Sequence, residues 1–186
     1  EAYGSHTTPM KWGSGGGSGY DFAREVDQPG GRGGGKFKVV SPGNVRVEGR
    51  IHANGGDYVG TYAGGGAGGS IWITAQEVQG EGSIEVIGGK GDTSEKDRAA
   101  GGGSGGRIAI YATLSSPDTD HFSGEYLTMG GTGSDRGHAS VAPLHGGAGT
   151  TYIHRTQIVK ETDKDGKVTT TTTKYNELQV ANDVPT

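Results

Sequence analysis

Several carboxylates in this chain could do chemistry, and two of them lie at repeating positions. Acidic side chains gathered from neighbouring segments can hold Ca²⁺ or act as a general acid and base on a polysaccharide. Glu48 and Glu81 fall at equivalent points of two similar stretches, where Arg46 or Arg50 could neutralise them. The sequence brings no three of these groups together, so we expect solvated strand-edge residues and not an enzyme site. The candidates are Glu48, Glu81, Glu85, Asp57 and Asp92.

Metal-binding patterns are weak. The six histidines form no HxH or HExxH motif, and only His138 and His145, with Asp135, share one loop. The stretch from Asp163 to Gly166 reads DKDG, but it lacks the third ligand and the distal Glu of a calcium loop. Between residues 157–162 and 167–173 it predicts the turn of a β-hairpin. We therefore predict no catalytic residue, no metal site and no cofactor.

Aromatic residues suggest a surface for sugars or for a protein partner. Trp72 and Tyr111 lie in two similar stretches, each beside isoleucines that alternate along the chain. If the isoleucines point inward, both rings point outward and could stack on a saccharide or on a neighbouring protein. Alignment of the two stretches sets Ala109 opposite Trp72, so the rings are offset. The alternative, which we favour, is that they pack beneath a loop.

A repeat organises the segments that carry these residues. Residues 64–75 read GGGAGGSIWITA, residues 101–112 read GGGSGGRIAIYA, and residues 30–41 read GGRGGGKFKVVS. Each has a glycine run and then an alternating apolar pattern, which is typical of a strand with one buried face. The inward candidates are Phe37, Val39, Ile71, Ile73, Ile108 and Ile110.

A second, weaker motif follows each of these stretches. Residues 48–56 read EGRIHANGG, residues 81–89 read EGSIEVIGG, and residues 123–131 read SGEYLTMGG. In the third stretch, alignment with the other repeats predicts that Tyr126 and Thr128 point inward. The hydrophobicity of the side chains instead predicts that Leu127 and Met129 do. A degraded fourth copy starts with GGAGTTYIHR at residue 146 and ends near residue 183.

These repeats predict an all-β fold, a glycine-rich parallel β-solenoid of about four coils with a C-terminal β-hairpin insertion. Glycine at this density excludes helical repeats, and the two or three strands in each repeat are too few for a propeller blade. We expect residues 1–186 to form a single module. Its repeats cover approximately residues 30–63, 64–100, 101–142 and 143–183, after a glycine-rich lead-in at 1–29.

The glycine runs admit two interpretations. They can be corners that need positive φ, where glycine is free of strain. They can also be extended, polyproline-II-like segments that lie over one another and make Cα–H···O contacts. The sequence favours the corner interpretation and leaves the second open, because GGGxGG is longer than a turn needs.

Composition excludes several function classes. Glycine makes up 40 of 186 residues, the net charge is −4, and there is no cysteine. The low charge argues against disorder, and 17 basic against 21 acidic residues give no basic patch for nucleic acid. No apolar run reaches membrane-spanning length, so we expect no membrane insertion. Without disulfides, stability has to come from backbone ladders and packing.

The ordered set of motifs resembles a glycine-rich repeat region of very large secreted or cell-surface proteins. The resemblance rests on TPMKWGSGGGSGY at residues 8–20, on the three glycine-run stretches, and on GGAGTTYIH near the end. It implies an extracellular location, an adhesive or structural role and no catalytic residues. The charged insertion at residues 157–174 departs from the pattern.

We expect a structural module that stacks end to end into a filament or adjoins further domains of a larger protein. Neither end carries an evident capping helix, so unpaired ladder groups would be exposed there. The uncharged strand at residues 169–173 would cross the junction between copies. A carbohydrate-binding or adhesive module is the second hypothesis, and a polysaccharide lyase or hydrolase the third. The assembly candidates are Thr169, Thr170, Thr171, Thr172 and Thr173.

Overall fold

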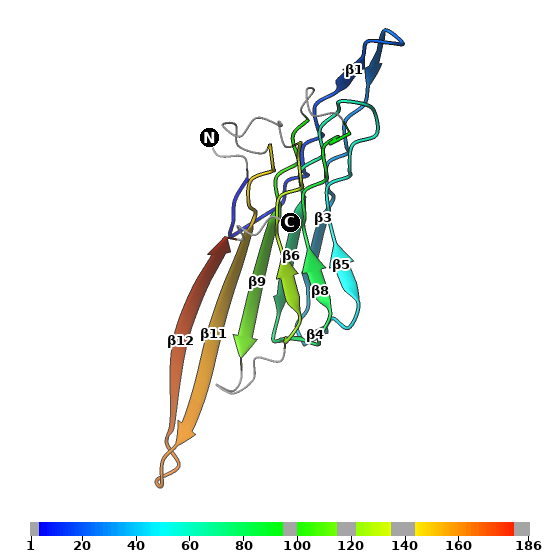
Figure 1. The fold of residues 1–186 in the computed structure, drawn as a ribbon. Helices are drawn as coiled ribbons and strands as arrows, with labels where there is room; N and C mark the ends of the chain where they lie inside the picture. Colours follow the sequence, from blue (N-terminus) through cyan, green and yellow to red (C-terminus); the bar gives the residue numbers. More distant parts are fainter. Residues whose placement is uncertain (1–3, 95–99, 115–121, 135–143, 181–186) are drawn as a thin grey trace.

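The computed structural model describes residues 4–94, 100–114, 122–134 and 144–180, which form β-strands and extended segments (Figure 1). This part of the chain contains no helix, and its sheets are parallel or mixed except for the short antiparallel pair of β1 and β2, so the all-β prediction is confirmed. The strands are β1 (Gly19–Asp21), β2 (Val26–Gln28), β3 (Lys36–Val40), β4 (Val45–Arg46), β5 (Arg50–His52), β6 (Ser70–Ala75), β7 (Val78–Gln79), β8 (Ser83–Glu85), β9 (Arg107–Leu114), β10 (Glu125–Leu127), β11 (Thr150–Thr162) and β12 (Val168–Val180).

The largest sheet stacks equivalent strands of successive repeats. Its strand order is β12-β11-β9-β6-β3, and the last four strands are parallel. Phe37 pairs with Ile71, and Ile71 pairs with Ile108. The predicted parallel pairing is therefore confirmed residue for residue. The register is well defined because a slip by one residue would turn every buried isoleucine towards solvent.

A second parallel ladder comprises β5, β8 and β10, and β4 pairs with β7. Tyr126 of β10 aligns with Ile84 and packs against the core, and Thr128 is buried. Repeat alignment is therefore the better guide in the third repeat. The backbone explains this result, because pairing with β8 fixes which residues of β10 face inward.

The apolar core between the ladders is narrow. Ile71, Ile73, Ile84 and Ile108 are fully buried, and each contributes about 1.5–3 kcal/mol to stability through its burial. Phe37 has the predicted register but is 41% exposed, because it lies on the edge strand β3, beyond which no described strand lies.

The glycine runs form a layer of their own, held together by backbone hydrogen bonds with a period of three residues. The N–H of Gly65 donates to the carbonyl of Gly101 at 3.0 Å, and Gly68 donates to Ser104 at 2.8 Å. A polyproline-II segment has three residues per turn, so every third residue faces the same neighbour. This layer consists of residues 30–35, 64–69, 101–106 and 144–149.

A second layer of extended segments lies against the glycine runs and runs antiparallel to them. Gly103 donates to the carbonyl of Gly89, and three residues later Gly106 donates to Val86. Segments within this layer are also bonded to one another, as Gly88 is to Met129 at 2.9 Å. The layer consists of residues 53–58, 86–92 and 128–134.

The corner interpretation of the glycine runs is wrong. Among the described glycines only Gly4, Gly80 and Gly166 have positive φ, and none of them belongs to a run. What requires glycine is close approach, since a Cβ on Gly66 or Gly103 would overlap the backbone of a neighbouring segment. The bare Cα–H of one segment therefore faces a carbonyl of the next.

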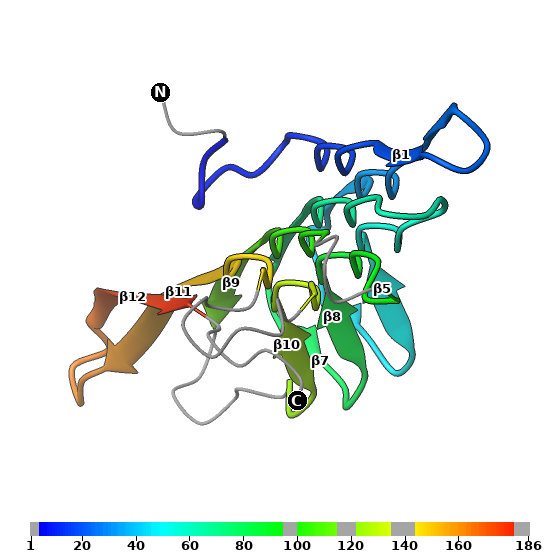
Figure 2. The same cartoon turned by 45° about the horizontal axis from the view of Figure 1, so that its top comes forward.

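Residues 13–18 add one more segment, here called the lead-in segment, on the outer side of the glycine runs (Figure 2). Gly16 donates to Gly31, and the lead-in carbonyls of Gly17 and Ser14 accept from Gly64 and Ala67. The lead-in segment thus covers the first two glycine runs. This position was not predicted, because residues 1–29 contain no apolar run.

β11 and β12 form the predicted C-terminal hairpin around the Asp-Gly turn. Asp163 accepts hydrogen bonds from the N–H groups of Asp165 and Lys167, and Gly166 has a φ of 79°. β11 begins as the fourth strand of the largest sheet and pairs with β9 only as far as Gln157. Beyond that residue the hairpin projects past the sheet (Figure 1).

The close packing of the runs makes a direct prediction. Gly103→Ala should lower the free energy of unfolding by about 1–3 kcal/mol, because the added methyl group meets backbone that has no room to move. Gly147→Ala is the matched control, since no atom lies within 4 Å of its Cβ position. The control should be neutral or stabilising by about 0.4–1 kcal/mol. Urea unfolding measures both, and equal losses would contradict close packing.

Candidate interaction surfaces

The candidate carboxylates are engaged in structural contacts. Glu85 is only 6% exposed and accepts hydrogen bonds from Ser83 at 2.7 Å and Asn54 at 3.1 Å. The guanidinium of Arg50 lies 3.6 Å from the same carboxylate. These contacts satisfy the charge of a side chain that would otherwise be costly to bury.

Glu48 and Glu81 have different surroundings. Glu48 makes an ion pair with Arg46 on the surface. Glu81 lines an open groove of about 570 Å³ beside β8 and β10, together with Arg50 and Glu125. Within the described ranges, no three acidic or histidine side chains are arranged to hold a metal ion.

Asp57 and Asn54 use their side chains to complete the second layer. Asp57 accepts a hydrogen bond from the N–H of Lys90 at 2.8 Å, and Asn54 accepts one from Ile87 at 2.8 Å. Neither N–H group donates to a backbone carbonyl of the described residues. Side chains of one repeat therefore take the place of a missing segment beside the next.

Asp92 holds a strained turn. Tyr62 has a φ of 62°, an uncommon value for a residue other than glycine, and its N–H donates to Asp92 at 2.7 Å. The same carboxylate accepts a bond from the N–H of Ser94 at 2.9 Å. Burial alone would raise the pKa of Asp92, but hydrogen bonds from Tyr62 and Ser94 outweigh it and leave the pKa lowered.

Acid should therefore weaken this turn. The stability from ionised Asp92 is present above the unfolded-state pKa, about 3.9, and is lost as the pH falls through the lower pKa of the folded state. Asp92→Asn should reduce that loss and cost about 1 kcal/mol at pH 7. Urea unfolding from pH 2 to pH 7 measures both effects. Asp27→Asn, on the exposed strand β2, controls for the change of charge, and an unchanged acid limb in Asp92→Asn would contradict the assignment.

The histidines also have structural neighbours. His145 accepts a hydrogen bond from the N–H of Gly133, and His154 contacts Asn176 and Thr156. His138 and Asp135, the other members of the loose metal alternative, lie outside the described residues.

Trp72 and Tyr111 point outward from the largest sheet, with the predicted offset. Trp72 pairs with Ala109 in the sheet, and the ring centroids of Trp72 and Tyr111 lie 6.0 Å apart. The aromatic row continues to Tyr152, 5.9 Å from Tyr111, and the ammonium of Lys38 lies 3.8 Å from the centre of the Trp72 ring. A cation over an aromatic face contributes about 0.5–1 kcal/mol at an exposed site.

The chain covers much of this aromatic row itself. The Tyr111 hydroxyl donates to the carbonyl of Thr7 at 2.9 Å, and Ser70 donates to the carbonyl of Lys11 at 2.7 Å. His6 packs edge-on against Tyr152. Burial raises the pKa of Tyr111, Tyr152 raises it further, and the hydrogen bond to Thr7 acts in the opposite direction. These contacts favour packing beneath a chain segment over saccharide binding.

Tyr111→Phe should loosen the segment at residues 4–12. Loss of the bond to Thr7 leaves this segment with one anchor fewer, so trypsin should cleave after Lys11 several-fold faster. The matched control is Tyr175→Phe, which removes an exposed hydroxyl bonded to Gln157 at 3.3 Å. Cleavage rates are followed by mass spectrometry of the released peptide. Equal rates in the wild type and in Tyr111→Phe would exclude this anchoring role.

Residues 169–173 of β12, here called the threonine segment, lie on the projecting part of the hairpin. Thr169 pairs with Glu161 and Thr173 pairs with Gln157, at and beyond the point where β9 ends. All thirteen residues of β12 are exposed, and its outer edge pairs with no described strand. β12 is therefore the longest open strand edge in the described part of the molecule.

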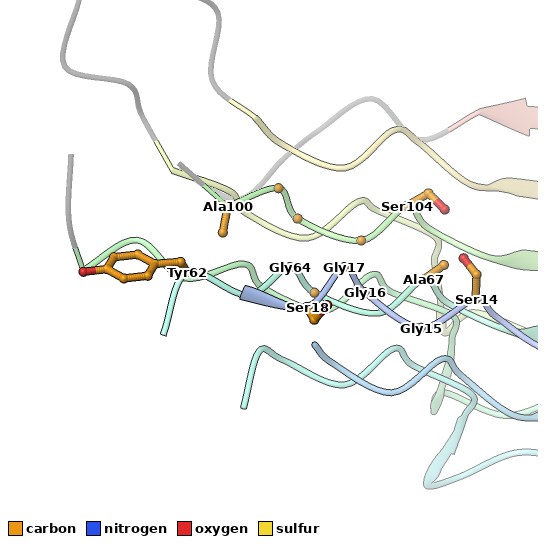
Figure 3. Close-up of a pocket in the computed structure, with 14 residues that line it drawn as sticks. Ser14, Gly15, Gly16, Gly17, Ser18, Tyr62, Gly64, Ala67, Ala100 and Ser104 are labelled. Carbon is orange, nitrogen blue, oxygen red and sulfur yellow. The ribbon is translucent and has the colours of Figure 1, made fainter. Parts of the chain in front are cut away.

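A groove of about 430 Å³ runs along the glycine runs (Figure 3). The lead-in segment and residues 100–104 lie on its two sides, with Gly64, Gly65 and Ala67 between them. Its lining is almost entirely backbone, serine and glycine. A third hollow of about 330 Å³ lies over the second layer, near Asp57, Lys90 and Thr132.

No family model, curated protein or solved structure matches the chain. The resemblance to glycine-rich repeat regions therefore stays an expectation from the sequence. No helix of the described ranges is long and apolar enough to cross a membrane.

Proposed function

We propose that this chain is a non-catalytic structural module, a short glycine-rich parallel β-solenoid that assembles through its open ends. Support comes from the regular step between repeats, which sets equivalent strands and equivalent glycine segments side by side. The chemistry of the carboxylates agrees, because Glu48, Glu85, Asp57 and Asp92 are engaged in ion pairs or hydrogen bonds within the fold.

The observation that carries the proposal is the pair of open edges of the largest sheet. β12 exposes thirteen residues at one end, and β3 leaves Phe37 41% and Val40 64% exposed at the other. An unpaired strand edge bonds to whatever strand is available unless charge, proline or a cover blocks it. β3 of one copy beside β12 of the next would extend the sheet by antiparallel pairing. This contact joins unlike surfaces, so it leads to an open filament.

The threonine segment suits this junction better than the rest of β12. If copies stacked with their cross-strand rows in line, Val39 of one copy would lie beside Glu177 of the next. Both residues belong to the cross-strand row that contains Ile153. A carboxylate would then lie beside the apolar end of the core, at a cost in desolvation. Residues 169–173 carry no charge, so a staggered arrangement that pairs them with β3 avoids this cost. Main-chain hydrogen bonds would supply the affinity, as in β-augmentation.

We also propose that the module is secreted or displayed at a cell surface, within a filament or beside further domains of a larger protein. The resemblance of its repeat motifs supports this location. A fold held by backbone hydrogen bonds is compatible with this location, because a chain without cysteine has no thiol that an oxidising environment could alter. A saccharide-binding role has less support, since Tyr111 and Tyr152 lie under residues of the N-terminal segment.

Substituting lysine for two residues of the threonine segment should abolish assembly. Thr171→Lys with Thr173→Lys places charge along the proposed junction, which blunts a strand edge. Electron microscopy and light scattering at high concentration should show filaments for the wild type and monomers for this variant. The matched control is Asn176→Lys with Leu178→Lys, on the same strand beside the sheet, and it should still assemble.

Two outcomes would overturn the proposal. A wild type that stays monomeric at high concentration removes the filament and leaves a spacer module. If the control variant loses assembly and the threonine variant keeps it, the junction lies at residues 176–180 and the threonine register is wrong.

A further inference from the structure

The groove beside the lead-in segment has the hydrogen-bonding pattern of an unfilled position in the glycine layers. In the second glycine run, the N–H groups of Gly64 and Ala67 face outward and donate to the lead-in segment at 2.9 Å each. Gly101 and Ser104 are the equivalent residues of the third run, one repeat later. Their N–H groups donate to no carbonyl of the described residues. They open onto the groove of about 430 Å³.

The lead-in segment shows what such a position accepts. Its sequence, GSGGGS, has only glycine and serine, and it runs antiparallel to the glycine runs beneath it. Gly13 and Gly16 face inward, where a Cβ would overlap the backbone of the second run. An occupant of the groove therefore has to be an extended segment with glycine or a small residue at every third position.

The outer side of the lead-in segment has the complementary pattern. Ser14, Gly15, Gly17 and Ser18 are exposed. Gly15 and Ser18 lie three residues apart, and neither their N–H groups nor their carbonyls bond to the described backbone. Gly101 and Ser104 are separated by the same three residues. One turn of a polyproline-II segment therefore sets both carbonyls opposite both N–H groups.

Only one symmetric arrangement lets two copies use these surfaces together. The lead-in segment is a ridge, and the groove runs beside it on the same face (Figure 3). A two-fold axis along the ridge places the ridge of each copy in the groove of the other. An axis across the ridge would superimpose the two ridges. The allowed axis keeps the partner's ridge antiparallel to the glycine runs, as each copy's own ridge already is.

We propose that the groove binds the lead-in segment of a second copy of this chain, so that two modules interlock face to face. The N–H groups of Gly101 and Ser104 of one copy donate to the carbonyls of Ser18 and Gly15 of the other, respectively, and the reverse. The contact is closed and self-complementary, unlike the open junction of the filament, and it does not depend on that junction.

Filling the groove with a large side chain tests the proposal. Ser104 is exposed, so Ser104→Trp should leave the fold intact while occupying the space of the incoming segment. Its control is Arg32→Trp, at an exposed position of the first glycine run outside the groove. All proteins also carry Thr171→Lys and Thr173→Lys, so that strand stacking does not contribute. Sedimentation equilibrium should show a dimer for the parent and the control, and a dissociation constant at least about tenfold weaker for Ser104→Trp.

A cysteine cross-link locates the contact. The chain has no cysteine, and a Cβ at Gly15 has 3.6 Å to its nearest backbone atom, so Gly15→Cys is tolerated. The two-fold axis sets both copies of residue 15 side by side, within the Cα separation of about 4.4–6.8 Å that a disulfide spans. Mild oxidation should give a covalent dimer for Gly15→Cys and none for Arg32→Cys. A monomeric parent, a Ser104→Trp variant that dimerises like the parent, or equal cross-linking of both cysteine variants would overturn the proposal.

Discussion

The hydrogen bond between neighbouring glycine segments is the interaction on which this fold depends. Each such bond contributes about 0.5–1.5 kcal/mol, and the bonds recur at every third residue along and between the layers. They form only if the segments approach until the bare Cα–H of one faces a carbonyl of the next, as at Gly66 and Gly103. That geometry excludes a Cβ. The glycine content is therefore a requirement of packing, which explains how a chain with so narrow an apolar core is ordered.

The glycine layers and the strand ladders have the same spacing from one repeat to the next, and this common spacing keeps them in register. Each glycine run continues directly into a strand of the largest sheet, as residues 64–69 continue into β6. A slip of the strands by two residues would preserve the alternation of Ile71 and Ile73 but break the three-residue period of the glycine bonds. A slip of three residues would preserve the glycine bonds but turn the isoleucines outward. Only a slip common to both periods, six residues, escapes both penalties, so the two halves define the register together.

The sequence predicts the ladders well because their signal is local. Alternation at Ile71, Ile73, Ile108 and Ile110, repeated at a nearly constant distance, is enough to give parallel pairing and register. It predicts the glycine layers poorly, because whether a glycine serves a turn or a close contact depends on neighbours that come from other repeats. For the same reason, neither the position of the lead-in segment nor the bond between Asp92 and Tyr62 was predicted. Neither is an apolar pattern, and each joins parts of the chain at least fifteen residues apart.

The N–H groups of each extended segment point in three directions, because the segment has three residues per turn. In the outermost segments, the N–H groups that point outward have no neighbouring segment to bond. The molecule meets this problem in different ways at different repeats. Over the second glycine run it adds the lead-in segment, and over the second layer it uses the side chains of Asn54 and Asp57. Over Gly101 and Ser104 the described chain supplies neither. A backbone donor in water is not costly to leave exposed, but one lying in a groove of matching period is poised to bind a further segment. A glycine layer is thus open to growth at its outer face, just as a β-sheet is at its edge strands.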